Sequence, residues 1–308
     1  MMMHNLLSKV LTTTPHKNVK IEALKQIAQE LRRQAVLMTH RAGSGHPGGS
    51  LSQAEILTAL YFFRMKHNPE NPQDPNRDIC ILSKGHCCPS FYAVLAEAGY
   101  FSKEELMSFR SMGSRLQGHV YAEVPGVELS TGSLGQGLSV GTGMALSFKI
   151  DKKPNHVFVL LGDGEMQEGS VWEAVMFAGR HQLNNLTAII DFNGVQQEGF
   201  TNEILDINTS ERPLAKKFAE FGWHAIEING NNMEEVVDAL RKVTSFKPLV
   251  IISHTKKGAG VSFMELNKAF HGKAPNDEEL KQALEEIKRE EIKIREIKSA
   301  GATGADTL

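Results

Sequence analysis

Cysteine is scarce in this chain of 308 residues, which contains only Cys80, Cys87 and Cys88. An odd number of cysteines, two of them adjacent, makes a poor framework for disulfide bonds. The three include no C-x-x-C pair of the kind that binds zinc. We therefore expect reduced thiols and a reducing compartment, the cytoplasm.

Long apolar runs and an excess of basic residues are also missing. No uninterrupted apolar segment approaches the roughly 20 residues that a helix needs to cross a bilayer. The formal net charge is −2, whereas nucleic acids and anionic membranes favour proteins with clustered positive charge. We expect neither as a partner. Residues 1–19 lack acidic side chains, as a transit peptide would, but they also lack arginine, which favours a plain N-terminal extension.

Helical and extended segments alternate along the rest of the chain. Apolar and small residues at helical spacing predict helices over 21–41, 52–65, 137–150, 171–183, 212–221, 232–243 and 277–298. Apolar runs predict strands over 78–83, 156–164, 186–193, 223–228 and 248–254. Ser52 is a candidate N-cap of the second helix. Strands of this kind, separated by helices, indicate an α/β fold with a doubly wound, mainly parallel sheet and helices on both faces.

The same pattern predicts the organisation of the chain. Residues 20–275 form the expected domain, preceded by the extension of residues 1–19. Residues 276–308 are expected to form a charged C-terminal helix and a flexible tail of small and polar residues. The composition, 41% hydrophobic and 23% charged, is ordinary for a globular protein.

Two polar residues mark the carboxyl ends of two successive predicted strands. Asp163 lies where the first strand ends, in the segment LLGDG, and Asn193 lies where the next strand ends, thirty residues later, in IIDFNGVQ. In a parallel sheet these strand ends lie side by side at the edge where ligands bind. A carboxylate and an amide oxygen are hard ligands suited to Mg²⁺, which shares its shell with water and phosphates. Gly162 and Gly164 allow close approach of the backbone, and the helix that follows can offer its first amides to a diphosphate.

These segments resemble the fingerprint of thiamine-diphosphate enzymes, and GDGEMQEGSVWEA resembles its transketolase form. The segments SGHPGGS, SKGH, the GH at 118–119, PGVELSTGSLGQGLSVGTGMA and HGKAP match transketolase motifs in the same order. The resemblance covers about residues 20–275. It implies the thiamine-diphosphate-binding fold of the diphosphate type, with thiamine diphosphate and Mg²⁺ as cofactors; Ca²⁺ or Mn²⁺ are possible substitutes for the magnesium.

The resemblance also implies roles for four histidines and a glutamate. His46 and His271 would assist proton transfers near the reacting carbon, His86 would reach the cofactor diphosphate, and His119 would bind a hydroxyl of the two-carbon donor fragment. Imidazole suits these tasks because it donates and accepts protons near neutral pH. Glu168 would join a carboxylate relay to the partner's active-site glutamate; its alternative role is a favourable charge at a helix start.

The remaining implied site residues surround the cofactor. Val195 would offer its backbone carbonyl to the metal beside Asp163 and Asn193. Gly132 and Leu134 would pack around the cofactor, together with Gly162 and Gly164. Asp191 would support the metal shell.

One half of a transketolase is missing from the resemblance. A full transketolase carries a pyrimidine-binding domain, which supplies the glutamate that activates the cofactor. We therefore expect a separate C-terminal subunit with that domain, an α2β2 assembly and sugar-phosphate substrates; a truncated chain is the alternative. The rival functions are another thiamine-dependent enzyme half, similar to deoxyxylulose-phosphate synthase or a 2-oxoacid dehydrogenase, and a non-catalytic regulatory protein.

A nucleophilic role for Cys87 or Cys88 beside His86 is disfavoured, because adjacent helical residues do not face each other.

Overall fold

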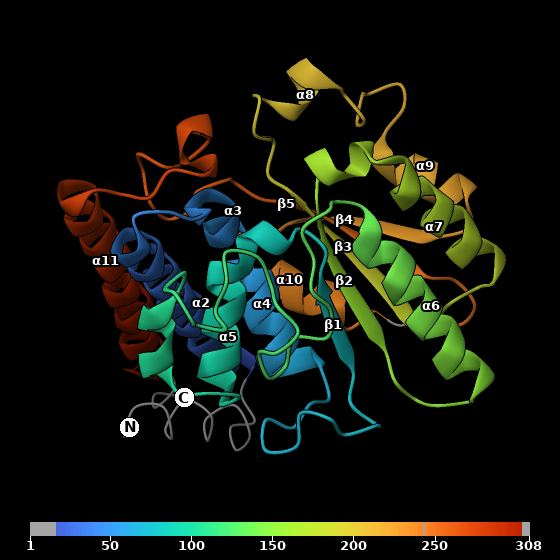
Figure 1. Ribbon diagram of the computed structural model, residues 1–308, viewed down its shortest axis with the longest axis horizontal. Helices are drawn as coiled ribbons and strands as arrows, with labels where there is room; N and C mark the ends of the chain where they lie inside the picture. Colours follow the sequence, from blue (N-terminus) through green and yellow to red (C-terminus); the bar gives the residue numbers. More distant parts are fainter. Residues whose placement is uncertain (1–16, 243, 304–308) are drawn as a thin grey trace.

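The computed structural model describes residues 17–242 and 244–303 of the chain (Figure 1). Most of the expected extension, residues 1–16, and the last residues of the expected tail, 304–308, lie outside the described residues. Within the described ranges, no helix is long and apolar enough to cross a membrane.

A five-stranded parallel sheet forms the centre of the molecule. Its strands are β1 (Ile79–Leu82), β2 (Val157–Gly162), β3 (Leu186–Phe192), β4 (His224–Asn229) and β5 (Leu249–His254), in the spatial order β1-β2-β3-β5-β4. Every neighbouring pair is parallel. The continuously apolar strands are buried on both sides, as expected for a parallel sheet. The predicted parallel sheet is confirmed, with each strand within two residues of its predicted start.

Helices cover both faces of this sheet (Figure 1). Alternate residues of β2 belong to two cores: Phe158 and Leu160 pack on one side, Val157 and Val159 on the other. The first core includes α2 (Lys17–Ala42), α4 (Ala54–Ala59), α5 (Cys88–Ala98) and α10 (Met233–Leu240). The second includes α6 (Gln136–Ile150), α7 (Gly169–Arg180) and α9 (Leu214–Glu220). The doubly wound fold is therefore confirmed.

The C-terminal helix α11 (Asp277–Thr303) lies along α2 at the side of the molecule (Figure 1). Ala283 and Ile287 of α11 pack with Val36 of α2 in a third, smaller core. The helix continues to Thr303, beyond its predicted end at residue 298.

The predicted helix 52–65 differs most from the structure. Helix α3 (Pro47–Ser52) begins five residues earlier, the chain breaks at Gln53, and α4 continues into a π-helical turn, η1 (Leu60–Arg64). The prediction that Ser52 is an N-cap is wrong, because its hydroxyl donates instead to the buried carboxylate of Asp191 at 2.6 Å. Five short segments were not predicted: the 3-10 turns η2 (Gly85–Cys87), η3 (Lys103–Ser108), η4 (Gly164–Gln167) and η5 (Lys268–His271), and α8 (Thr201–Ile204). Helix α5 was also not predicted.

Candidate functional site

The carboxyl ends of β2 and β3 bring the two predicted metal ligands together. Asp163 follows β2 and is 2% exposed; Asn193 follows β3 and is 5% exposed. The backbone N–H of Gly194 donates to the Asp163 carboxylate at 2.6 Å. The Asn193 amide donates to Asp191 at 3.0 Å. The register of the two strands, which pairs Gly162 with Asp191, places all of these groups at one edge of the sheet.

A cavity of about 460 Å³ opens at this edge. Of the site residues predicted from the sequence, all except Asp191 line it: His46, His86, His119, Gly132, Leu134, Gly162, Asp163, Gly164, Glu168, Asn193, Val195 and His271. They come from the loop before α3, from η2, from the 118–135 segment, from the ends of β2 and β3, and from η5. Segments that are far apart in the sequence thus meet in one concave site, as expected for an α/β sheet.

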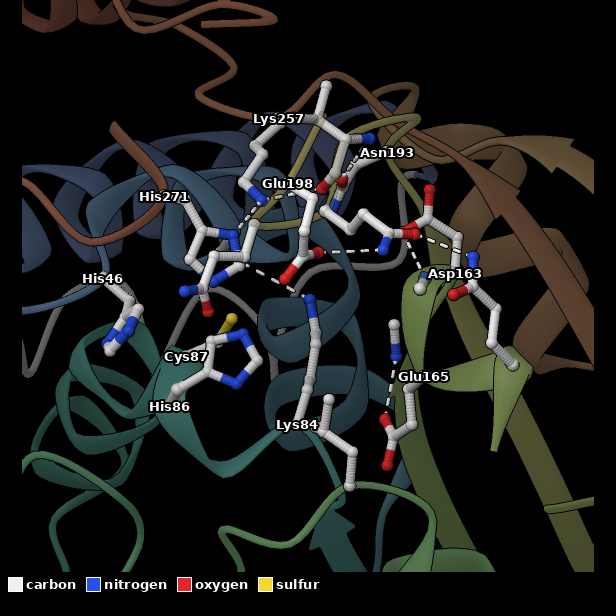
Figure 2. Close-up of a pocket in the computed structure, with 18 of the residues that line it drawn as sticks. His46, Lys84, His86, Cys87, Asp163, Glu165, Asn193, Glu198, Lys257 and His271 are labelled. Atoms are coloured by element: carbon white, nitrogen blue, oxygen red, sulfur yellow. Dashed lines mark hydrogen bonds between the residues drawn. The ribbon is translucent and has the colours of Figure 1, made fainter. Parts of the chain in front are cut away.

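Four histidines line the cavity, and Figure 2 shows three of them, His46, His86 and His271, on one side of it. The ring of His46 lies 5.0 Å from that of His86, 5.5 Å from that of His271 and 6.1 Å from that of His119, measured between centroids. Burial, with nearby positive groups, lowers the pKa of His46 to about 4 and that of His271 to about 3. Burial also lowers the pKa of His86 and of His119. All four imidazoles are therefore neutral near pH 7 and able to accept a proton.

Asp163 has the character of a cation ligand. Burial, followed by repulsion from Asp191, raises its pKa to about 6, and hydrogen bonds from Gly194 and Gly164 oppose that rise. A buried carboxylate of this kind gains from a bound cation, because the cation offsets the cost of burying its charge. Among the described residues, no cluster of three or more His, Cys, Asp or Glu side chains could hold a metal by itself. The available donors are one carboxylate, one amide and a backbone carbonyl, a set that suits Mg²⁺ when phosphate and water complete its shell.

Two lysines inside the cavity were not predicted from the sequence. Lys257 donates to the Val195 carbonyl and to His271 Nδ1, each at 2.7 Å. The carbonyl of the predicted metal ligand Val195 therefore already accepts one hydrogen bond and keeps one lone pair for a metal. Lys84 forms an ion pair with Asp191, and both side chains are at most 3% exposed. Figure 2 shows Lys84 and Lys257 between the histidines and Asp163, where an anionic group would meet two positive charges.

Asp191 organises the floor of this site. Burial alone would raise the pKa of its carboxyl group, but Lys84 and hydrogen bonds from Ser52 and Thr255 hold it below the ordinary value. The charged carboxylate in turn accepts from Asn193. This contact agrees with the supporting role that the resemblance implies for Asp191.

Comparison with known proteins shows to which family the chain belongs. The sequence model described as "Transketolase, thiamine diphosphate binding domain" matches residues 23–297. The chain belongs to the transketolase family.

The relatives of this transketolase-family chain fall into two sizes. It is 40% identical over 271 residues to one of the subunits of the apulose-4-phosphate transketolase of Phocaeicola vulgatus, covering 87% of this chain and 95% of that protein. It is 42% identical over 270 residues to the 6-deoxy-6-sulfo-D-fructose transketolase subunit SqwG of Clostridium sp. (strain MSTE9), covering 87% and 97%. Human transketolase is 40% identical over 269 residues, but the chain spans 42% of its length. The solved transketolase of Campylobacter jejuni superposes with a TM-score of 0.82 at 35% identity, covering 87% of this chain and 43% of that one.

Two glutamates of the transketolase motif GDGEMQEG have different surroundings. Glu168 lies at the cavity rim, is exposed, and precedes α7 without capping it through its side chain. Glu165, which was not predicted, is buried and accepts from the backbone N–H groups of Gly135 at 2.8 Å and Gly162 at 3.0 Å, and from the Ser83 hydroxyl. It thus ties the ends of β1 and β2 to the start of α6, and no periodic pattern in the sequence could have singled it out.

Proposed function

We propose that this chain is the thiamine-diphosphate- and Mg²⁺-binding subunit of a split transketolase. With a partner subunit, it would transfer a two-carbon ketol unit from a ketose phosphate to an aldose phosphate. The observation that carries the proposal is the single cavity that unites the four histidines with Asp163 and Asn193. The relatives named as subunits support the split form, because the chain covers 95% and 97% of their lengths.

The anionic part of the cofactor is proposed to bind at the sheet edge. Asp163, Asn193 and the Val195 carbonyl would hold the metal, while Gly162 and Gly164 leave space for the diphosphate. His86 would donate to a phosphate oxygen, and Gly132 and Leu134, which also line the cavity, would pack against the cofactor. Bound thiamine diphosphate would supply a nucleophilic carbon that adds to the donor carbonyl, and a thiazolium ring that takes up the electron pair of the broken carbon–carbon bond.

The proton transfers are assigned to the histidines. His46 and His271 face the same space with centroids 5.5 Å apart, and both are neutral near pH 7. Each could therefore take a proton from a donor hydroxyl and return it later. His119 lies 6.1 Å from His46 and would orient the donor through a hydroxyl group.

The partner is proposed to be a C-terminal transketolase subunit with the pyrimidine-binding domain. Glu168 is exposed at the cavity rim, where a carboxylate relay could continue into a second chain. Near that rim, Phe200, Ile204 and Leu205 are 40%, 47% and 54% exposed, an apolar group suited to a protein neighbour. Gln167, which lines the cavity, contacts the Leu205 carbonyl at 3.3 Å. We propose an α2β2 assembly in the cytoplasm, with cofactor sites between unlike chains.

The test is a reconstitution that separates ketol transfer from decarboxylation. The purified chain is mixed with the protein encoded next to it, Mg²⁺ and thiamine diphosphate. Ketose phosphates, including xylulose 5-phosphate, are offered with an aldose phosphate, and 2-oxoacids are offered in parallel. We expect two-carbon transfer without release of carbon dioxide. Carbon dioxide release from a 2-oxoacid would instead assign the chain to another thiamine-dependent enzyme, and cofactor binding without turnover of any substrate would favour a regulatory protein.

A further inference from the structure

Arg110 has a backbone conformation that is unusual for its residue type. Its φ angle is 60°, in the left-handed region that residues other than glycine seldom adopt. The backbone N–H of Arg110 donates to the Leu116 carbonyl at 2.9 Å and so closes the loop between them. The conformation directs the arginine side chain toward the segment before α3, although the two segments are 66 residues apart in the sequence.

The guanidinium of Arg110 connects two loops of the site. One nitrogen donates to the hydroxyl of Ser44, two residues before His46. The same group lies against Gly118, the residue before His119, where a Cβ atom would collide with the guanidinium. Its Nε is buried and has no hydrogen-bond partner within the described part of the chain. Hydrogen bonding alone therefore does not account for the position of this group.

The positive charge of Arg110 acts on both neighbouring imidazoles. Burial is the largest cause of the lowered pKa of His46, and Arg110 is the next, ahead of His119 and Lys257. For His119, burial is again the first cause and Arg110 the second. The other titratable groups that face these rings are His86, which contacts both, and His271, which contacts His46.

We propose that Arg110 is a positioning residue that joins the His46 loop to the His119 loop and places a fixed positive charge beside both rings. Arg110 itself does not line the cavity, so it acts through the two histidines and not on substrate. An arginine suits this role because its planar group can pack on a glycine, donate to a hydroxyl and stay charged at every physiological pH. The two imidazoles then stay neutral over a wider pH range, each with one ring nitrogen free to accept a hydrogen bond.

The first test needs no activity. The histidine resonances of the full chain are titrated by NMR in the wild type, Arg110→Met, Arg110→Lys and Arg115→Met. Arg115 is the matched control, since it belongs to the same loop but pairs with Glu105. We expect Arg110→Met to raise the pKa of His46 and of His119, Arg110→Lys to leave them nearer the wild type, and Arg115→Met to change neither. Unmoved titrations in Arg110→Met, or equal changes in Arg115→Met, would overturn the electrostatic part of the proposal.

The second test measures catalysis and rests on the proposed ketol transfer. In the reconstituted enzyme, Arg110→Lys keeps the charge but loses the planar fork, so we expect kcat/KM to fall roughly tenfold through misplaced histidines. In Arg110→Met, the acidic limb of the pH profile should also move to higher pH. A wild-type rate and profile in both variants would refute the positioning role. If Arg110→Met does not fold, the test uses Arg110→Lys and Ser44→Ala instead. A wild-type kcat/KM in both of these variants would refute the positioning role. An inactive wild type with the expected NMR shifts would contradict the proposed function and leave the electrostatic inference standing.

Discussion

Asp163→Asn is predicted to flatten the pH dependence of stability and to abolish metal-dependent cofactor binding. The pKa of Asp163 rises from 3.8 to about 6 because the carboxyl is buried and close to Asp191. A carboxyl group with a raised pKa binds more protons in the folded state than in the unfolded state. Its contribution to the free energy of unfolding is therefore largest below pH 3.8 and is lost as the pH rises through about 6. Asparagine does not titrate, so the free energy of unfolding of Asp163→Asn does not decrease for this reason as the pH rises.

The size of the effect follows from the two pKa values. The interval from 3.8 to about 6, at about 1.4 kcal/mol for each pKa unit, corresponds to about 3 kcal/mol. Roughly half of this change falls between about pH 5 and 7.5. The carboxylate also accepts from the N–H groups of Gly164 at 2.9 Å and Gly194 at 2.6 Å. An asparagine would turn its NH2 toward one of them, at a pH-independent cost of about 1–3 kcal/mol.

The assay is urea unfolding of the metal-free chain between pH 5 and 8, together with calorimetry of thiamine diphosphate binding with Mg²⁺. Relative to the wild type, Asp163→Asn should gain stability as the pH rises and should lose the metal-dependent heat of binding. Asp151→Asn, at an exposed carboxylate that follows α6, is the matched control and should run parallel to the wild type. If the stability of Asp163→Asn changed with pH in parallel with that of the wild type, the claim that the buried Asp163 carboxylate is costly would be refuted. Unchanged cofactor affinity would refute the metal assignment.

Three further changes test other parts of the site. His119→Ala should preserve cofactor binding and slow donor turnover in the reconstituted enzyme; loss of binding by calorimetry would show that its role is different. Lys84→Met should destabilise the chain by about 3–5 kcal/mol in urea unfolding, because it leaves the Asp191 carboxylate buried and unpaired. Lys293→Met, which breaks an exposed pair, should cost at most about 1 kcal/mol, and equal losses would contradict the reasoning. Burial raises the pKa of Cys87 and of the other two thiols. None of the three should therefore react with iodoacetamide before the protein unfolds. Rapid labelling of the native protein at Cys87 would contradict this prediction.

The sheet could be predicted from the sequence because its evidence is local. Apolar runs such as 156–164 and 186–193 reveal buried parallel strands without knowledge of any partner. The topology rule then places Asp163 and Asn193 at the same edge, and the structure confirms that they are neighbours. The histidine-bearing motifs added His46, His86, His119 and His271, which line the same cavity.

The parts that could not be predicted depend on long-range contacts. Lys84 meets Asp191 across 107 residues, and Arg110 reaches Ser44 across 66. Nothing in their own neighbourhoods marks Lys84 as buried or Arg110 as partly buried, since lysine and arginine are usually exposed. Ser52 was placed at a helix start by its local pattern, but its hydroxyl bonds to Asp191 inside the fold. In each case a buried or partly buried charged group contacts a partner that sequence periodicity does not reveal.

We propose that this chain supplies the metal and diphosphate site of a transketolase whose other half is a separate protein. The most direct measurement is ketol transfer with Mg²⁺ and thiamine diphosphate by the chain alone, by the neighbouring protein alone and by their mixture. We predict transfer by the mixture only, with a native mass that corresponds to two copies of each chain. Full activity of this chain by itself would contradict the claim.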